Sequence, residues 1–196
     1  FKATWVSHSS LRDYIACPRS YYLKNVYKDP NTRNKIAVMN PALALGQAVH
    51  NTLEALSSIP TAERFDTPLP ERFAAEWKKV SGKAGGFLNQ STEDEYHRRG
   101  REMIARVYNN PGPITRKAVK IKKDLPYFWL SEEEEIILCG KIDWLEYLED
   151  KQAVHIIDFK TGKNKENDKS LQLPIYRLLV QNCQKWPVDG ASYWYL

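Results

Sequence analysis

The sequence has no long apolar run, and this excludes a membrane-spanning helix. No stretch approaches the roughly 18 consecutive apolar residues that a membrane-spanning helix needs. The first residues, Phe1-Lys-Ala-Thr-Trp, also lack the apolar core of a secretion signal. The chain begins without an initiator Met, so we expect an excised or processed piece, and we expect no membrane partner.

Cysteine is scarce, with Cys17, Cys139 and Cys183 the only three, and no two of them form a CxxC pair. This spacing argues against a disulfide framework and against a self-contained zinc site. We therefore expect a reducing, cytoplasmic setting.

Charge of either sign is not in large excess. The net charge is +5 and the isoelectric point is near 9.0, which favours an anionic partner only weakly. The hydrophobic content of 42% and the aromatic content of 12% are typical of a globular protein. A length of 196 residues is ample for a hydrophobic core, and no internal repeat is visible.

The strongest helical pattern covers residues 41–56. One stripe at helical spacing is apolar and consists of Leu45, Val49, Leu53 and Leu56. An adjacent stripe carries Gly46, His50 and Glu54, four residues apart. A histidine in such a place is more often a hydrogen-bonded residue at the edge of a core than a ligand, so His50 gains interest only from the residues described below.

The period of the hydrophobic pattern changes along the chain from helical to extended. Residues 71–80 and 92–108 are predicted helices, and 170–184 is another. Strands are expected at 119–123, 126–130, 135–139, 140–148, 154–160 and 191–196. This order predicts an α/β fold, with a central mixed β-sheet flanked by helices.

We expect one domain over residues 1–196. Its N-terminal helices, 1–56, carry His50. Residues 57–113 form an inserted helical subdomain, and residues 114–196 form the sheet core.

The segment 139–163 predicts a β-hairpin that brings charges together. With Asp150 and Lys151 at the centre of its turn, Asp143 lies directly opposite Asp158, and Lys160 shares their face. Like charges placed opposite one another destabilise a sheet. The pair therefore suggests a bound cation.

Two carboxylates and an imidazole are suitable ligands for Mg²⁺ or Mn²⁺. A lysine beside such an ion can position or deprotonate a water, as phosphodiester hydrolysis requires. The structural alternative is an ion-pair cluster of Asp143, Asp158 and Lys160. A second open question is whether residues 19–28, which mix basic and aromatic side chains, face nucleic acid or form an ordinary amphipathic helix.

Five motifs in order resemble one family. They are C-P-R-S-Y-Y-L at 17–23, G-Q-A-V-H at 46–50, G-K-I-D at 140–143, I-I-D-F-K-T-G at 156–162 and Q-L-P-I-Y at 172–176. Together they resemble the RecB-like and AddB-like branch of the PD-(D/E)XK nuclease superfamily, which also includes the CRISPR adaptation nucleases. The resemblance implies a restriction-endonuclease-like core.

The resemblance also implies roles for individual residues. His50, Asp143 and Asp158 would be metal ligands, with the Phe159 carbonyl completing the shell. Lys160 would be the catalytic lysine, acting with Asp143 and Asp158. Asp158 stands where many relatives have Glu, which shortens the reach of this ligand by one methylene.

Gln172 and Tyr176, one helical turn apart, would line the active site and contact the substrate. Iron–sulfur members of the branch combine a cysteine placed like Cys17 with three more after the final strand. Cys139 and Cys183 are not at those positions, and four thiolates are needed, so we expect no iron–sulfur cluster in this chain.

The sequence thus predicts a Mg²⁺- or Mn²⁺-dependent deoxyribonuclease. We expect an exonuclease on single strands or DNA ends in DNA repair or recombination, with DNA and a helicase or other repair subunits as partners. The alternative is a DNA-binding module of a larger helicase–nuclease assembly with little or no catalysis. Action on RNA is a third possibility.

Overall fold

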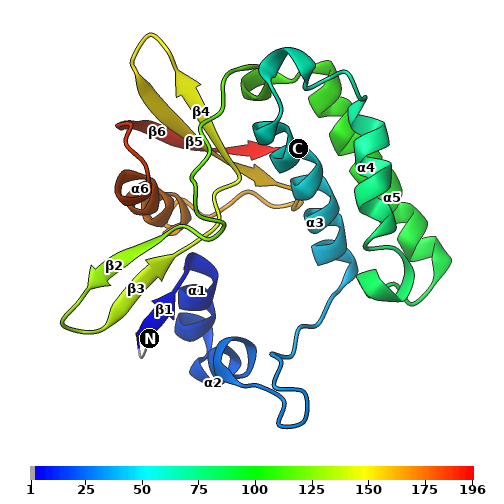
Figure 1. Ribbon diagram of the computed structural model, residues 1–196. Coiled ribbons are helices and arrows are strands. Elements are labelled where there is room, and N and C mark those ends of the chain that lie inside the picture. Colours follow the sequence, from blue (N-terminus) through cyan, green and yellow to red (C-terminus); the bar gives the residue numbers. More distant parts are fainter. Residues whose placement is uncertain (1–2) are drawn as a thin grey trace. The chain divides into compact units, whose positions relative to one another are not determined.

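The computed structural model describes residues 3–196, whose internal contacts divide them into two compact units (Figure 1). Each unit combines segments that are distant in the sequence. The first unit consists of residues 1–38, 121–141 and 169–185, and the second of residues 39–120, 142–168 and 186–196.

The first unit contains a small mixed sheet and helices. Its strands are β1 (Thr4–Val6), β2 (Tyr127–Ser131) and β3 (Ile136–Cys139), in the order β1-β3-β2. β1 is parallel to β3, whereas β2 is antiparallel to it. The α-helices are α1 (His8–Ala16), α2 (Pro18–Tyr21) and α6 (Gln172–Cys183), and a π-helical turn (Tyr22–Val26) follows α2.

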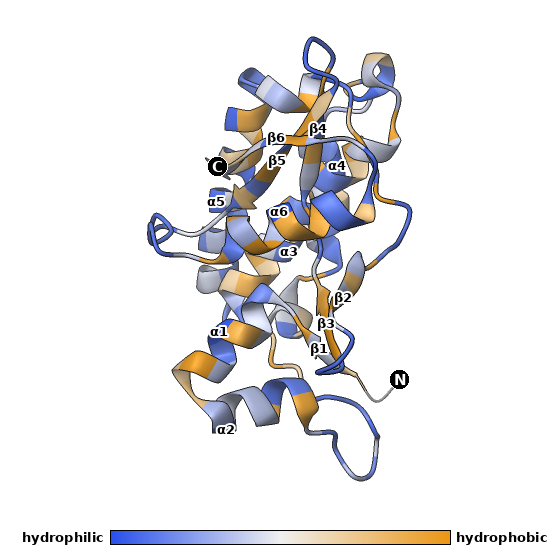
Figure 2. Ribbon diagram, turned by 90° about the vertical axis from the view of Figure 1, so that its left-hand side faces the viewer, coloured by the Kyte–Doolittle hydropathy of each residue, from blue (hydrophilic) through white to orange (hydrophobic). Residues whose placement is uncertain are grey.

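The core of this unit is small. Leu138 of β3 packs with Ile175 and Leu179 of α6, and all three are at most 8% exposed. Figure 2 shows both hydrophobic and hydrophilic residues along α6, as expected of an amphipathic helix that buries one side.

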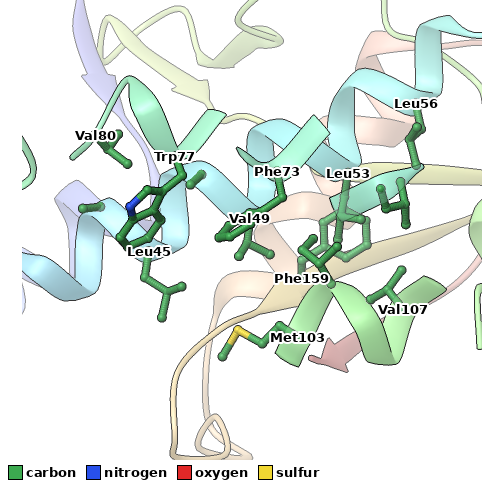
Figure 3. Close-up of a cluster of buried hydrophobic side chains, with 14 of the residues drawn as sticks. Leu45, Val49, Leu53, Leu56, Phe73, Trp77, Val80, Met103, Val107 and Phe159 are labelled. Atoms are coloured by element: carbon green, nitrogen blue, oxygen red, sulfur yellow. The ribbon is translucent and has the colours of Figure 1, made fainter. Parts of the chain in front are cut away.

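The helices of the second unit are α3 (Pro41–Glu54), α4 (Leu69–Lys78) and α5 (Gln90–Asn109). Short 3-10 turns connect them at Ala55–Ser58, Thr61–Glu63 and Gly82–Gly85, and another at Gly112–Thr115 follows α5. The predicted apolar stripe of α3 is fully buried. Figure 3 shows these side chains meeting Phe73 and Trp77 of α4, Met103 and Val107 of α5, and Phe159.

The helices of this unit pack closely at Gly100 of α5. A Cβ atom at this position would lie 2.3 Å from Cζ of Phe73 and 3.0 Å from Cδ1 of Leu45. Only a glycine allows α5 to approach its neighbours this closely.

The sheet of the second unit has the order β4-β5-β6, with β4 (Trp144–Leu148), β5 (Ala153–Lys160) and β6 (Val188–Tyr195). β4 and β5 form an antiparallel hairpin, and β6 is parallel to β5. One face of this sheet contributes Trp144, Ile157 and Phe159 to the helical core. Because β5 and β6 are parallel, their carboxyl ends lie at the same edge of the sheet.

The predicted mixed α/β fold is confirmed, and each predicted helix is present within two residues or so of its expected ends. The strands differ in three respects. Within residues 3–196 they form two three-stranded sheets, where the sequence predicted one central sheet. The predicted strand 119–123 is wrong, because only an isolated bridge between Ala118 and Glu146 forms there, and β1 was not predicted.

None of the helices in residues 3–196 combines the length and apolar character needed to cross a lipid bilayer. The three cysteines are all free, with Cys17 exposed and Cys139 buried.

Candidate metal and catalytic site

The hairpin of the second unit has the predicted register. Trp144 pairs with Ile157 and Leu148 with Ala153, which centres the turn on Asp150 and Lys151. Asp143 lies one residue before the paired part of β4, so it is not itself a ladder residue. Its Oδ2 instead accepts a hydrogen bond of 2.8 Å from the backbone N–H of Phe159. This bond holds the Asp143 carboxylate beside Asp158.

Successive side chains at the end of β5 point to opposite faces of the sheet. Phe159 points into the helical core and is 2% exposed. Asp158 and Lys160 share the opposite face. Asp158 is only 3% exposed, although it is a carboxylate. Nζ of Lys160 lies 3.0 Å from Oδ2 of Asp158.

His50 reaches the same place from α3. Its Nδ1 lies 3.2 Å from Oδ1 of Asp143 and 3.8 Å from Oε1 of Glu54, one helical turn further on. Burial lowers the pKa of His50, but the carboxylates of Asp143 and Glu54 outweigh it and raise this pKa to about 10. In the absence of a metal the ring therefore carries a proton that a metal would have to displace.

The two aspartates repel one another as the sequence predicted. Burial is the main cause that raises the pKa of Asp158 to about 6, and the charge of Asp143 adds to it. The positive charges of Lys160 and His50 oppose this shift only in part. An additional positive charge would therefore stabilise this pair of carboxylates.

Lys160 lies between two carboxylates. Besides Asp158, Nζ of Lys160 contacts Oε1 of Glu166 at 3.1 Å. Burial lowers the pKa of Lys160, but these two carboxylates outweigh burial and raise the pKa above its usual value. In this arrangement Lys160 is a fixed ammonium group that can donate to an anion.

The Phe159 carbonyl lies on the side expected of a ligand. In an extended strand, the N–H and the C=O of one residue point to the same edge. The N–H of Phe159 donates to Asp143, so its carbonyl also points toward Asp143. The carbonyl of the next residue, Lys160, points the other way and accepts from the N–H of Leu196.

Gln172 and Tyr176 belong to the first unit. They lie one turn apart on α6, and Nε2 of Gln172 donates to the Tyr176 hydroxyl at 3.1 Å. The structure therefore brings together His50, Asp143, Asp158, Phe159 and Lys160 within one unit, and separately pairs Gln172 with Tyr176.

Two carboxylates of the site were given no role from the sequence. Glu54 had a visible signal, since it follows His50 by four residues on the same helical stripe. Glu166 had none, because it lies in the polar loop after β5, where no periodic pattern fixes the direction of a side chain. Its position is set by its backbone N–H, which donates to the Tyr195 hydroxyl at 2.9 Å.

The donor set fits a divalent metal ion. One ligand atom from each of His50, Glu54 and Asp143 lies within 4.8 Å of the other two. Carboxylates with one imidazole suit Mg²⁺ or Mn²⁺, and the raised pKa of Asp158 indicates where more positive charge would be stabilising. Such an ion polarises a phosphate and increases the acidity of water.

A sequence model of the PD-(D/E)XK nuclease superfamily matches residues 5–196. The chain belongs to this superfamily. The match covers both units and every residue of the site. No curated protein is significantly similar to the chain. Membership agrees with the donor set, since nucleases of this superfamily use divalent metal ions.

Proposed function

We propose that this protein is a Mg²⁺- or Mn²⁺-dependent DNA nuclease that hydrolyses phosphodiester bonds. The observation that carries the proposal is the cluster at the end of β5. There a buried carboxylate with a raised pKa, Asp158, lies beside a second carboxylate, a histidine and a lysine. A purely structural ion-pair cluster would not need two carboxylates that repel one another.

Each side chain has a defined part in this proposal. His50, Asp143 and Asp158 hold the ion in this proposal, and the Phe159 carbonyl lies on their side of β5. Glu54, which groups with His50 and Asp143, is a further carboxylate for the ion. Lys160 presents its ammonium group to the phosphate and to the attacking water, where it stabilises negative charge. Gln172 and Tyr176 contact the substrate from α6.

Cleavage of labelled DNA with Mg²⁺ or Mn²⁺ tests the proposal, with Asp158→Ala and Lys160→Ala as the variants. The hairpin offers a matched control at its other end. There Lys151 forms an exposed ion pair with Asp189, at 2.9 Å between Nζ and Oδ1. We expect Lys151→Ala and Asp189→Ala to cleave like the natural chain, and the two site variants to lose cleavage.

Two results would contradict the proposal. Cleavage that survives in both site variants, or that survives chelation of the metal, would place the chemistry elsewhere. DNA binding without cleavage under either metal, with all ligands intact, would favour a binding module.

We further infer that residues 1–196 act as one nuclease domain of the RecB-like branch. The support is the order of the five motifs and the Gln172–Tyr176 hydrogen bond. An exonuclease that works on single strands or ends in DNA repair or recombination, beside a helicase, fits this branch. Free cysteines fit a cytoplasmic setting. Digestion of end-labelled and circular DNA would separate exonuclease from endonuclease action.

A further inference from the structure

A basic surface outside the candidate metal site lies at the same edge of the sheet as Lys160. It is a cavity of about 420 Å³ between one face of α5 and the loop that follows β5. Gly162, two residues after Lys160, is part of its wall. Lys160 itself does not line the cavity, but the wall starts only two residues after it, and the cavity lies wholly within the second unit.

The wall of this cavity is rich in positive charge. Arg99 and Arg106 come from α5, and Lys163 and Lys165 come from the loop. None of these four makes an ion pair with a carboxylate among residues 3–196. The one acidic residue of the wall is Glu102, and it is already paired with Arg98.

Helical spacing explains why α5 presents these charges together. Arg99, Met103 and Arg106 stand at intervals of four and three residues, so they share one face. The guanidinium of Arg99 lies 5.0 Å from the centre of the Tyr96 ring, which restricts its orientation. Arg101 is exposed on another face of α5 and is not part of the wall.

An aromatic pair connects the cavity with the catalytic lysine. Tyr195 is 40% exposed and lines the cavity. Its ring centre lies 6.1 Å from that of Tyr193, and Nζ of Lys160 lies 4.8 Å from the Tyr193 ring centre. Tyr195 is also the register partner of Lys160 on β6.

We propose that this surface binds single-stranded DNA next to the scissile phosphate, a proposal that rests on the proposed function. Arg99, Arg106, Lys163 and Lys165 contact consecutive phosphates, and an unpaired base stacks on Tyr195. A cationic groove with an exposed aromatic ring is suited to single strands, because the face of a base is accessible only outside a duplex. The contact between the Glu166 N–H and the Tyr195 hydroxyl holds the ring in place.

The test measures binding of a labelled oligodeoxythymidylate and of a duplex of equal length, with a chelator present so that no cleavage occurs. We expect Arg99→Ala combined with Arg106→Ala to lower the salt dependence of binding, by roughly 0.7 in logarithmic slope per lost phosphate contact. Tyr195→Leu should weaken binding of the single strand roughly 5- to 150-fold, the range for one stacked base. Tyr195→Phe keeps the ring and should recover most of this binding, short of the part that depends on the hydroxyl contact with the Glu166 N–H.

Arg101→Ala is the matched control on α5 and should bind like the natural chain. The proposal is overturned if the double arginine variant keeps the salt slope of this control. It is also overturned if Tyr195→Leu binds the single strand normally. The same holds if Tyr195→Leu lowers the affinity for the duplex as much as the affinity for the single strand. The proposed function fails in a different way, namely when the single strand binds normally but no divalent metal produces cleavage.

Discussion

The two faces of β5 illustrate how one short strand supports both the fold and the candidate chemistry. Ile157 and Phe159 are buried in the helical core of the second unit, where apolar contacts stabilise the fold. On the other face, Asp158 is buried and Lys160 half-buried among charges, and the pKa of Asp158 is raised. The first face contributes stability, whereas the second retains an arrangement that costs stability. Such a conflict is typical of functional sites.

The core face should be most sensitive in stability. Phe159→Ala removes a fully buried ring that packs with Trp144 and Trp194, and we expect a loss of about 3–5 kcal/mol in the free energy of unfolding. Chemical denaturation measures this loss. An effect below about 1 kcal/mol would show that the face does not carry the core.

The charged face should be most sensitive in activity. Asp143→Ala and Lys160→Ala should each lower the cleavage rate by roughly a thousandfold, corresponding to several kcal/mol of lost transition-state stabilisation. Their melting temperatures should stay near that of the natural chain. If a variant lost activity only because it unfolds, the charged face would affect stability as the core face does, and its separate role in activity would be contradicted.

Without metal, the charged face should lower the free energy of unfolding by an amount that depends on pH. The pKa of Asp158 is about 6 in the folded protein, against 3.8 as its ordinary value. Because this pKa is raised on folding, protonated Asp158 contributes fully to the free energy of unfolding below pH 3.8. This contribution is lost as the pH rises through about 6.

We therefore expect Asp158→Asn to stabilise the metal-free protein at pH 7.5 by about 1–3 kcal/mol, and to have little effect near pH 4. Thermal unfolding at both values measures this difference. If Asp158→Asn were no more stable than the natural chain at pH 7.5, ionised Asp158 would not destabilise the metal-free protein.

Two helical glycines should give the smallest effects, and in opposite directions. Gly100→Ala places a Cβ 2.3 Å from Phe73 and should cost about 1–3 kcal/mol. At Gly46 the nearest atom to a Cβ is Oγ1 of Thr161 at 3.5 Å, an ordinary contact. Gly46→Ala should therefore stabilise α3 by up to about 1 kcal/mol. Denaturation of both variants checks the pair.

The site was predictable where a regular period carried it. Alternation and a polar turn gave the register of the hairpin, so Asp158 and Lys160 were placed on one face. The helical period placed His50 on an edge of α3. Asp143, however, was expected within the ladder and lies before it, because its side chain bonds to the Phe159 N–H.

The rest depended on contacts that no local pattern shows. Glu166 reaches Lys160 only because the loop after β5 folds back onto Tyr195. The division of the strands into two sheets depends on pairings between distant segments, such as β1 with β3. Residues 119–123 alternate apolar and basic side chains at their start, as a strand would, but within this range only the N–H of Val119 bonds to β4.

The proposed site for a divalent ion lies between α3 and the end of the hairpin. Titration of Mn²⁺ into the natural chain, followed by electron paramagnetic resonance, tests it most directly. We expect tight binding that falls at least roughly tenfold in Asp143→Asn and in His50→Ala, and that is unchanged in Asp189→Ala. Equal Mn²⁺ affinity in all four proteins would contradict the account.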